Sequence, residues 1–409
     1  MLTDDFRHAV QQLGAARTRT ALTVLAVAVG VLAVVVLVSL GQSALVSLTR
    51  GVEAIGGTRV IMVWPDAPQQ AAKKQASHTD GLTLADARAL RGRLPHVETV
   101  SPMGGGGDDS QAVHAPGGRV ARMDILGIDE AYLGGHALKL ADGRGISRED
   151  VDRKDKVCVL GHGAATRLFP DGGATGREIR VGENRYRIVG TLAMALKAGM
   201  RFGFDWNDVV MVPLTIASPE GRLRMITLTT RASRHNPDVV AHANSLLLHR
   251  HRGVDDFQFL DLGTMIAGFY KAYDAMIVLV GLLAGVSLVI GGVGITNMML
   301  VGVVERTREI GLRLALGAPP ALIRRQFLIE ALVLAGAGGL AGLGAGTGIV
   351  GLMALIVPRI QPDWSVVLSW PAVGAAVVAT LATGVVFGWM PARKAASLDP
   401  VAALRGDAG

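Results

Sequence analysis

The chain contains 409 residues, of which 50% are hydrophobic, 4% aromatic and 18% charged. This balance is too apolar for an ordinary soluble protein of this length. The net charge of +7 would suit a nucleic-acid-binding protein, but the basic residues lie largely beside apolar stretches, so we expect no nucleic-acid partner. Cys158 is the single cysteine, which excludes a disulfide within the chain.

Four long stretches of the chain contain almost no charged residue. The first runs from Thr20 to Gly51 and is interrupted only by Arg50. A helix crosses the bilayer core with about 20 apolar residues, and each stretch is longer than that. We therefore predict transmembrane helices at residues 20–48, 273–303, 327–357 and 370–391. The alternative, buried helices of a soluble core, would require four unusually long core helices in one chain.

Arginine and lysine residues indicate on which side of the membrane each segment lies. They precede the first apolar stretch, fill the segment between the second and the third, and follow the fourth. By the positive-inside rule, we predict that three segments are cytoplasmic: residues 1–19, 304–326 and 392–409. Residues 49–272 and the short loop 358–369 then lie outside. The pattern is that of a multi-pass protein of the inner (cytoplasmic) membrane.

The external segment 49–272 differs sharply from the membrane stretches, because it is polar, rich in turns and contains both strand and helix patterns. It predicts a folded α+β domain. A strand-helix-strand pattern near each end flanks a middle part that is rich in short strands. We therefore predict one subdomain built from residues 49–130 and 215–272, into which residues 131–214 are inserted as a second.

Local patterns predict several elements inside this domain. Thr83 followed by Asp86 resembles a capped helix start, and the helix is predicted to end at Leu94, before Pro95. Further helices are predicted at 162–168 and 237–251. Runs of β-branched and apolar residues predict strands at 59–64, 97–103, 120–128, 156–160, 178–181, 186–191, 209–212 and 225–230.

Two groups of residues in the domain contain side chains that bind metals. Asp108 and Asp109 follow a glycine run, and three histidines lie on the predicted helix 237–251, namely His242, His249 and His251. A solvated loop and a basic helix end explain the two groups without any metal. We prefer these explanations and predict no metal site.

Glycines in the membrane stretches are spaced for close helix contact. Gly281 and Gly285 form one G-x-x-x-G pair, and the third stretch repeats this spacing at Gly338, Gly342 and Gly346. Small residues let helix backbones approach closely, which favours association in lipid. We predict that these five glycines are sites of helix packing.

The sequence lacks the motifs of an energy-coupled or catalytic protein. It contains no G-x-x-x-x-G-K-[ST] phosphate-binding loop, no H-E-x-x-H motif and no nucleophile elbow. Apart from Arg50, the four stretches, read as residues 20–51, 275–304, 331–358 and 364–392, also lack the acidic or basic residues that mark many ion-coupled transporters. We therefore predict a non-catalytic chain without a cofactor of its own.

The segment after the second apolar stretch is the most informative in the chain, because an apolar helix end runs directly into amphipathic, charged residues. One face of the predicted helix holds Val303, Thr307, Ile310 and Leu314. Another holds Glu305, Arg306, Glu309 and Arg313. Glu309 and Arg313 are spaced for a favourable i,i+4 ion pair. Two interpretations fit: a helix anchored to lipid headgroups, or a docking helix that transmits force from a cytoplasmic ATPase.

Several segments of the chain resemble the MacB/FtsX-like ABC transporter permease family. The most specific is residues 304–318, VERTREIGLRLALGA. The C-terminal segment 391–404, PARKAASLDPVAAL, and residues 18–25, TRTALTVL, also resemble the family. In the external domain, VLGHGAATRLF at 159–169 and GREIRVG at 176–182 are similar to the family's periplasmic core. The resemblance spans nearly the whole chain.

The resemblance implies a four-helix permease that dimerises, either with a second copy of itself or with a paralogous permease. The external α+β domain would be periplasmic, with a porter subdomain (49–130 and 215–272) and a Sabre-like insert (131–214). Family members are thought to work by mechanotransmission, in which ATP hydrolysis in the cytoplasm moves the periplasmic domain. The coupling helix would then comprise Glu305, Arg306, Thr307, Arg308, Glu309, Ile310, Gly311, Leu312 and Arg313.

The nucleotide-binding domain that precedes the permease part in MacB is not in this sequence. We therefore expect ATP and Mg²⁺ to bind a separate cytoplasmic ABC ATPase subunit. In a two-membrane envelope, a membrane-fusion adaptor and an outer-membrane channel would complete a system for efflux of a drug, peptide, siderophore or lipoprotein-like substrate. The alternatives are a non-transporting membrane regulator or sensor of envelope processes and an ion-coupled secondary transporter.

Overall fold

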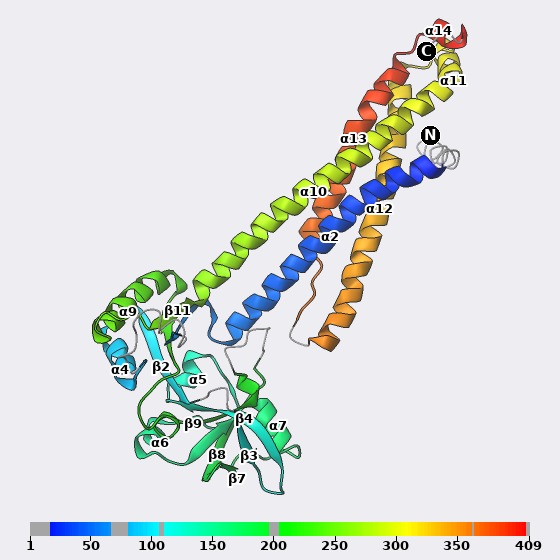
Figure 1. Cartoon of the computed structure of the whole chain (residues 1–409). Coiled ribbons are helices and arrows are strands. Elements are labelled where there is room, and N and C mark those ends of the chain that lie inside the picture. Colours follow the sequence, from blue (N-terminus) through cyan, green and yellow to red (C-terminus); the bar gives the residue numbers. More distant parts are fainter. Residues whose placement is uncertain (1–16, 67–80, 106–109, 196–203, 362–363, 406–409) are drawn as a thin grey trace. The chain divides into compact units, whose positions relative to one another are not determined.

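The computed structural model describes residues 17–66, 81–105, 110–195, 204–361 and 364–405. Asp108, Asp109 and most of the predicted N-terminal segment lie outside the described residues. The chain divides into two compact units (Figure 1). We call Met1–Leu45 with Lys271–Gly409 the helical unit, and Val46–Tyr270 the domain unit.

Four long helices form most of the helical unit: α2 (Arg17–Ala54), α10 (Leu262–Glu305), α12 (Pro320–Ile360) and α13 (Trp370–Ala396). Within the described residues, these four are long and apolar enough to cross a membrane. Each contains one predicted span and extends beyond it. With 44 residues, α10 is about 66 Å long, roughly twice the thickness of a bilayer core. The prediction of four apolar helices is confirmed.

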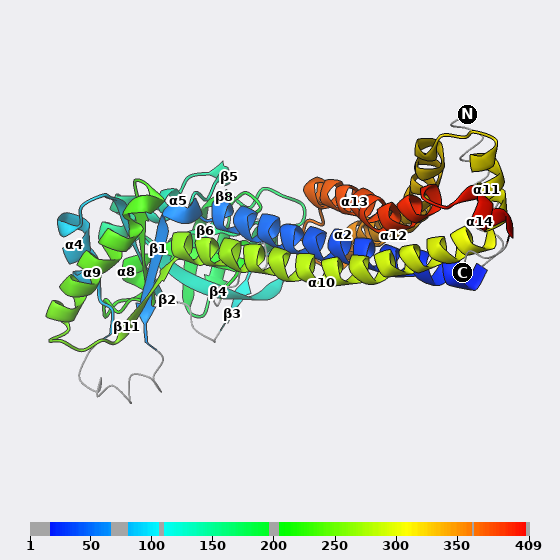
Figure 2. The ribbon, with the colours of Figure 1, turned by 90° about the horizontal axis from the view of Figure 1, so that it is seen from above.

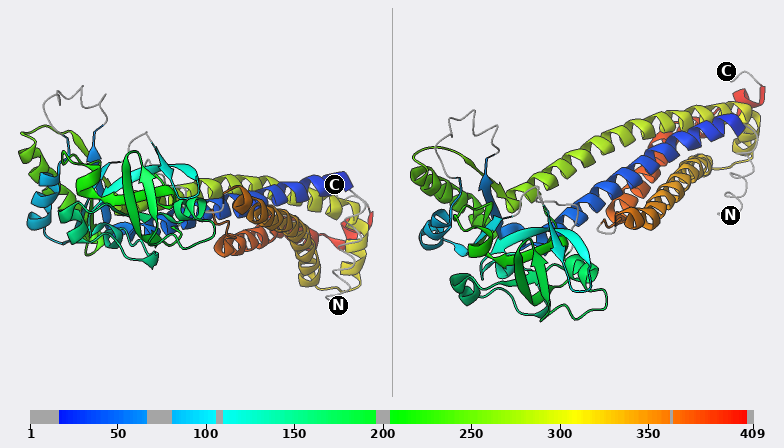
Figure 3. Two further views of the ribbon diagram at one scale, coloured as in Figure 1. Left: turned by 90° about the horizontal axis from the view of Figure 1, so that it is seen from below. Right: turned by 60° about the horizontal axis from the view of Figure 1, so that its bottom comes forward.

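The long helices pack closely against one another within the helical unit. Helices α2 and α10 lie side by side (Figures 1 and 2), and the Ser287 hydroxyl of α10 donates a hydrogen bond of 2.9 Å to the Ala26 carbonyl of α2. Helices α12 and α13 form another close pair, which Figure 3 shows from two further sides. There a Cβ atom added to Gly384 of α13 would lie 3.0 Å from the Cβ atom of Ala335. Small residues thus permit close approach of these helices.

The domain unit is built on one sheet with the strand order β11-β1-β10-β2-β4-β3-β7-β8-β6-β9, and β5 pairs with β8. The strands are β1 (Val60–Pro65), β2 (Val97–Gly105), β3 (Gln111–His114), β4 (Val120–Ile128), β5 (Leu140–Gly143), β6 (Val157–Leu160), β7 (Glu178–Val181), β8 (Asn184–Leu192), β9 (Val209–Pro213), β10 (Met225–Thr230) and β11 (Phe257–Asp261). The described part of the segment therefore mixes strands and helices, as predicted for an α+β domain.

Strands β11, β1, β10 and β2 form an antiparallel layer covered on one face by two helices, α4 (Leu84–Arg93) and α9 (Asn236–Arg250). Alternation along β1 directs Ile61 and Val63 toward these helices, whereas Val60 and Met62 belong to the core on the other face. Two of the long helices are connected directly in sequence to strands of this layer. Strand β1 follows α2 in the chain, and its neighbour β11 immediately precedes α10.

The remaining strands close into a ring. Strand order runs β4-β3-β7-β8-β6-β9, and β9 pairs back onto β4 in parallel. Cys158 and Leu160 of β6 point into the core of this ring. Burial raises the pKa of the Cys158 thiol, so this side chain is an unreactive core residue, as its strand position predicts. The predicted boundary at residues 130/131 falls just after β4, a strand that also pairs with β2.

The short helices of the insert are α5 (Tyr132–Gly135), α6 (Arg148–Arg153) and α7 (His162–Leu168), and α8 (Leu214–Ala217) begins at its last residue. The Tyr132 side chain of α5 is fully buried where the ring meets the antiparallel layer. Its hydroxyl accepts a hydrogen bond of 3.3 Å from Trp206 Nε1 and contacts the Met103 sulfur at 3.5 Å. Because both partners are buried, this contact fixes the two parts of the domain to each other.

Candidate functional site

The predicted coupling segment is divided by a corner. Helix α10 ends at Glu305, Arg306 leaves the helical conformation, and the short helix α11 (Thr307–Ala315) begins after it. The predicted coupling segment 305–313 therefore consists of the last residue of α10, the corner at Arg306 and most of α11. The Thr307 hydroxyl lies 3.0 Å from the Val303 and Val304 carbonyls and donates to the last turn of α10. The corner leaves carbonyl groups at the end of α10 without a helical N–H partner, and the Thr307 hydroxyl satisfies them instead.

Arg306 joins the corner to α12 through an ion pair. A guanidinium nitrogen of Arg306 lies 3.6 Å from a Glu330 carboxylate oxygen, and the two side chains are only 26% and 16% exposed. Charges that are partly removed from water attract each other more strongly than exposed ones, and either would be costly if left alone. Glu330 falls within the predicted span 327–357, and the sequence reasoning gave it no role. An acidic residue at the end of an otherwise apolar span was the available signal.

The inner face of α11 packs against the C-terminal helix α14 (Pro400–Arg405). Ile310 and Gly311 are buried there, and Ala403 of α14 is buried against them. A Cβ atom on Gly311 would lie 2.5 Å from the Ala403 Cβ atom, which real structures do not allow. The two segments that resemble the permease family most clearly, 304–318 and 391–404, therefore meet in space.

The side chains on the opposite face of α11 are exposed. We define the outer face of α11 as Arg308, Leu312 and Leu316; the two leucines are 50% and 79% exposed. Glu309 and Arg313 form the predicted i,i+4 ion pair at 2.5 Å beside this face, and Arg313 also bonds the Gln326 amide oxygen at 3.1 Å. The outer face of α11 thus exposes one basic and two apolar side chains.

Three of the predicted packing glycines, Gly338, Gly342 and Gly346 of α12, face α2. A Cβ atom on Gly338 would lie 2.9 Å from the Val24 carbonyl, and one on Gly346 would lie 3.1 Å from the Val35 Cβ atom. At Gly342 it would clash with the Ala28 carbonyl and lie 2.8 Å from the Val31 Cβ atom. Backbone atoms cannot move aside as a flexible side chain can, so this stripe must stay free of side chains.

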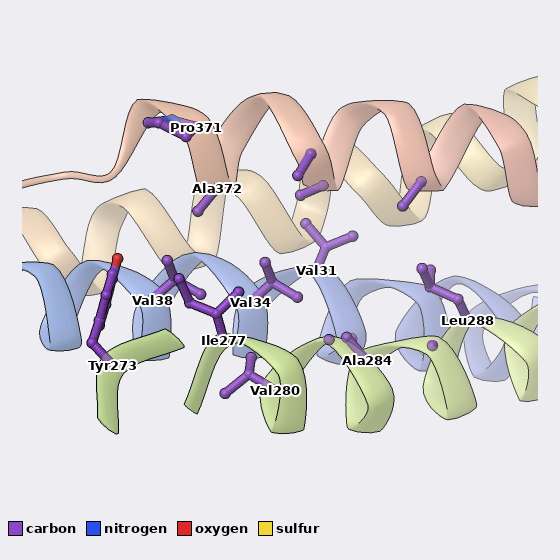
Figure 4. Close-up of a pocket in the computed structure, with 16 residues that line it drawn as sticks. Val31, Val34, Val38, Tyr273, Ile277, Val280, Ala284, Leu288, Pro371 and Ala372 are labelled. Atoms are coloured by element: carbon purple, nitrogen blue, oxygen red, sulfur yellow. The ribbon is translucent and has the colours of Figure 1, made fainter. Parts of the chain in front are cut away.

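The other two glycines, Gly281 and Gly285 of α10, have no such neighbour. An added Cβ atom at either position would meet no described atom within 4 Å. Both line an apolar pocket of about 420 Å³ between α2, α10 and α13. Figure 4 shows side chains from these three helices around it, including Val34 of α2 and Ala372 of α13. The same glycine spacing thus has two different surroundings in one chain.

Serines of α2 hold the segment that leads into α13, a contact that the sequence reasoning missed. The Ser43 hydroxyl oxygen accepts a hydrogen bond of 2.8 Å from the Val367 N–H, and the Ser39 hydroxyl oxygen accepts one of 3.1 Å from the Ser369 N–H. The predicted external loop 358–369 is therefore tied to α2. The i,i+4 spacing of two serines in an apolar helix was the available signal.

The metal candidates of the sequence are not brought together. Within the described residues, no group of three or more His, Cys, Asp or Glu side chains is arranged to hold a metal ion. His242 is exposed and bonds the Asp238 carbonyl of its own helix, whereas His251 is buried between carboxylates. His249 is exposed on the last turn of α9.

Two family descriptions match the chain. "MacB-like periplasmic core domain" matches residues 20–246, and "FtsX-like permease C-terminal" matches residues 281–400. The "Macrolide export ATP-binding/permease protein MacB" of Hyphomonas neptunium is 34% identical over 408 residues. That match covers 98% of this chain but 61% of the relative, so the chain spans about three fifths of the length of such relatives.

A second relative matches end to end. The "Uncharacterized ABC transporter permease YknZ" of Bacillus subtilis is 29% identical over 406 residues, which is 99% of both chains. Among solved structures, the periplasmic region of MacB from Actinobacillus actinomycetemcomitans has a TM-score of 0.44 and 19% identity, and covers 55% of this chain and 97% of that chain. On the two family matches, which together span most of the chain, this protein belongs to the MacB/FtsX-like family of ABC transporter permeases.

Proposed function

We propose that this chain is the permease subunit of an ABC transporter and that the outer face of α11 receives a separate cytoplasmic ATPase. The observation that carries the proposal is the position of α11. Its inner face is packed and its outer face is open, with two exposed leucines beside Arg308. A partner that presses on the outer face would move such a helix as a rigid body.

Three connections would carry a push on α11 to the membrane helices. The corner at Arg306 leads directly into α10, and the ion pair between Arg306 and Glu330 leads into α12. Through Gly311 and Ala403, α11 also contacts α14, which follows α13 in the chain. Motion of α10 and α2 would then reach the neighbouring strands β11 and β1, which is the mechanotransmission that we propose.

The proposal includes a topology and an assembly. The ends of the chain and residues 304–326 would be cytoplasmic, and the domain unit periplasmic, by the positive-inside rule. ATP and Mg²⁺ would bind the ATPase, and the permease would act as a dimer, with a membrane-fusion adaptor and an outer-membrane channel where there are two membranes. A relative is named for macrolide export; for this chain we propose efflux of a drug, peptide, siderophore or lipoprotein-like substrate.

The double variant Glu309→Ala, Arg313→Ala tests the role of α11. An exposed ion pair contributes about 0–1 kcal/mol to stability, so the fold should survive. We expect reduced assembly with the candidate ATPase, or ATPase activity that no longer responds to the permease, measured on co-purified protein. The control is Glu149→Ala, Arg153→Ala, which removes a more exposed i,i+4 pair in the domain unit. Normal assembly and coupling in the α11 variant would favour a sensor or regulator instead.

A further inference from the structure

His251 lies at the end of α9 with carboxylates at both of its ring nitrogens. Its side chain is 6% exposed. Nδ1 lies 2.6 Å from an Asp256 carboxylate oxygen, and Nε2 lies 3.4 Å from a carboxylate oxygen of Asp86. Asp86 belongs to the first turn of α4, and Asp256 immediately precedes β11. One imidazole ring thus joins three elements of the domain unit.

Counting donors and acceptors fixes the protonation state of this ring. An ionised carboxylate only accepts hydrogen bonds, and a neutral imidazole has a single N–H donor. If His251 were neutral, one ring nitrogen would point its lone pair at a buried carboxylate oxygen. Both contacts are satisfied only when both ring nitrogens carry a proton. The geometry therefore requires an imidazolium cation.

The charges around the ring agree with this assignment. The Arg250 side chain donates from Nε to the second oxygen of Asp86 at 2.6 Å, while Thr83 donates from its N–H and its hydroxyl. With His251 protonated, two cations face the two carboxylates. A neutral His251 would remove one of these two positive charges from beside two buried carboxylates, which is unfavourable. A cation at the C-terminal end of α9 also interacts favourably with the helix dipole.

We propose that His251 is a charged clamp that closes α4 and α9 onto the start of β11, and that its deprotonation opens the clamp. Within the described residues, the further ring contact is with an uncharged side chain. The Phe257 ring lies edge-on to the His251 ring, and the two ring centroids are 5.5 Å apart. Next to the clamp, the Asp66 N–H donates to the Asp256 carbonyl at 2.7 Å, which extends the pairing of β1 with β11 to the clamp.

The direction of the pH effect follows from linkage. The hydrogen bond to Asp86, followed by the bond and charge of Asp256, raises the pKa of His251 above its ordinary value of 6.5, although burial opposes this. The stabilisation is therefore complete below that ordinary value and is lost as the pH rises through the higher pKa of the folded protein. The clamp is closed below pH 6.5 and opens as the pH rises through the higher pKa of His251 in the folded protein.

The test is hydrogen exchange of the full chain in lipid nanodiscs, read by mass spectrometry between about pH 5.5 and about pH 9 and corrected for intrinsic exchange. Protection of peptides from α4 and α9 should fall as the pH rises, by about tenfold for each unit by which the pKa is raised. His251→Gln should abolish this pH dependence. His242→Gln, which removes an exposed histidine from the same helix, should leave it unchanged.

A second variant keeps the proposal testable if His251→Gln does not fold. Asp256→Asn removes one carboxylate from the ring and should shift the loss of protection to lower pH. Protection in the wild type that does not change with pH would overturn the proposal. An identical pH profile in Asp256→Asn, or in a folded His251→Gln variant, would also overturn it, because the titrating group would then lie elsewhere.

Discussion

Gly342→Leu is expected to destabilise the helical unit strongly. The first added carbon atom would overlap the Ala28 carbonyl and lie 2.8 Å from the Val31 Cβ atom, so α2 and α12 would have to separate. Overpacking of this kind costs about 1–3 kcal/mol, and more where backbone atoms are involved. The loss should appear as a lower unfolding temperature in detergent and a lower yield of folded protein.

The matched control for this variant is Gly344→Leu. It introduces the same side chain on the same helix, two residues away, where an added Cβ atom meets no described atom within 4 Å. Replacing glycine in an exposed helix interior gains about 1 kcal/mol of helix propensity, so this variant should be neutral or slightly stabilised. Equal stability of the two variants would show that α2 does not pack against the glycine stripe of α12.

Gly311→Leu is expected to uncouple the proposed ATPase while leaving the outer face of α11 unchanged. The new side chain would displace Ala403 and with it α14, which breaks the third connection of α11. A cost of about 1–3 kcal/mol corresponds to a change of about 5- to 150-fold in how often α14 is docked. ATPase activity of the co-purified complex should therefore fall toward that of the ATPase alone.

The control for Gly311→Leu is Gly302→Leu, one turn before the corner. An added Cβ atom at Gly302 meets no described atom within 4 Å, so this substitution should preserve coupling. Binding of the ATPase should remain in both variants, because Arg308, Leu312 and Leu316 are untouched. Normal coupling in Gly311→Leu would show that the α14 contact has no part in transmission.

The elements that were predicted correctly have signals that are local in the sequence. The charge-free stretches give the long helices because a bilayer requires about 20 apolar residues in a row. Thr83 and Asp86 form the reciprocal cap at the start of α4, and the predicted strands 120–128 and 178–181 match β4 and β7. In each case, a short-range pattern decides the local structure.

The elements that were missed depend on distant partners. β5 is exposed and carries the polar sequence LADG, so only its pairing with β8 makes it a strand. Arg306 at the corner pairs with Glu330, which lies 24 positions later in the sequence. Neither contact produces a periodic signal in the sequence.

The glycines show what a sequence motif can and cannot predict about helix packing. The G-x-x-x-G spacing at 281/285 and at 338/342/346 indicates that a backbone can approach, but the spacing does not say which helix does so. At 338–346 the neighbour is α2, within the same unit. At Gly281 and Gly285, no atom of the described residues lies within 4 Å of an added Cβ atom, so no helix backbone of this chain approaches there. Only the packed structure separates the two cases.

The most direct test of the central claim is disulfide crosslinking from the outer face of α11 to the candidate ATPase. Cys158 is buried and its thiol is unreactive, so Leu316→Cys would introduce the one accessible thiol among the described residues. Paired with single cysteines on the ATPase surface, it should give a crosslinked permease–ATPase product on oxidation. Glu220→Cys, exposed in the domain unit, is the control and should give none. A Leu316→Cys variant that crosslinks no more than Glu220→Cys does would contradict the claim that α11 docks the ATPase.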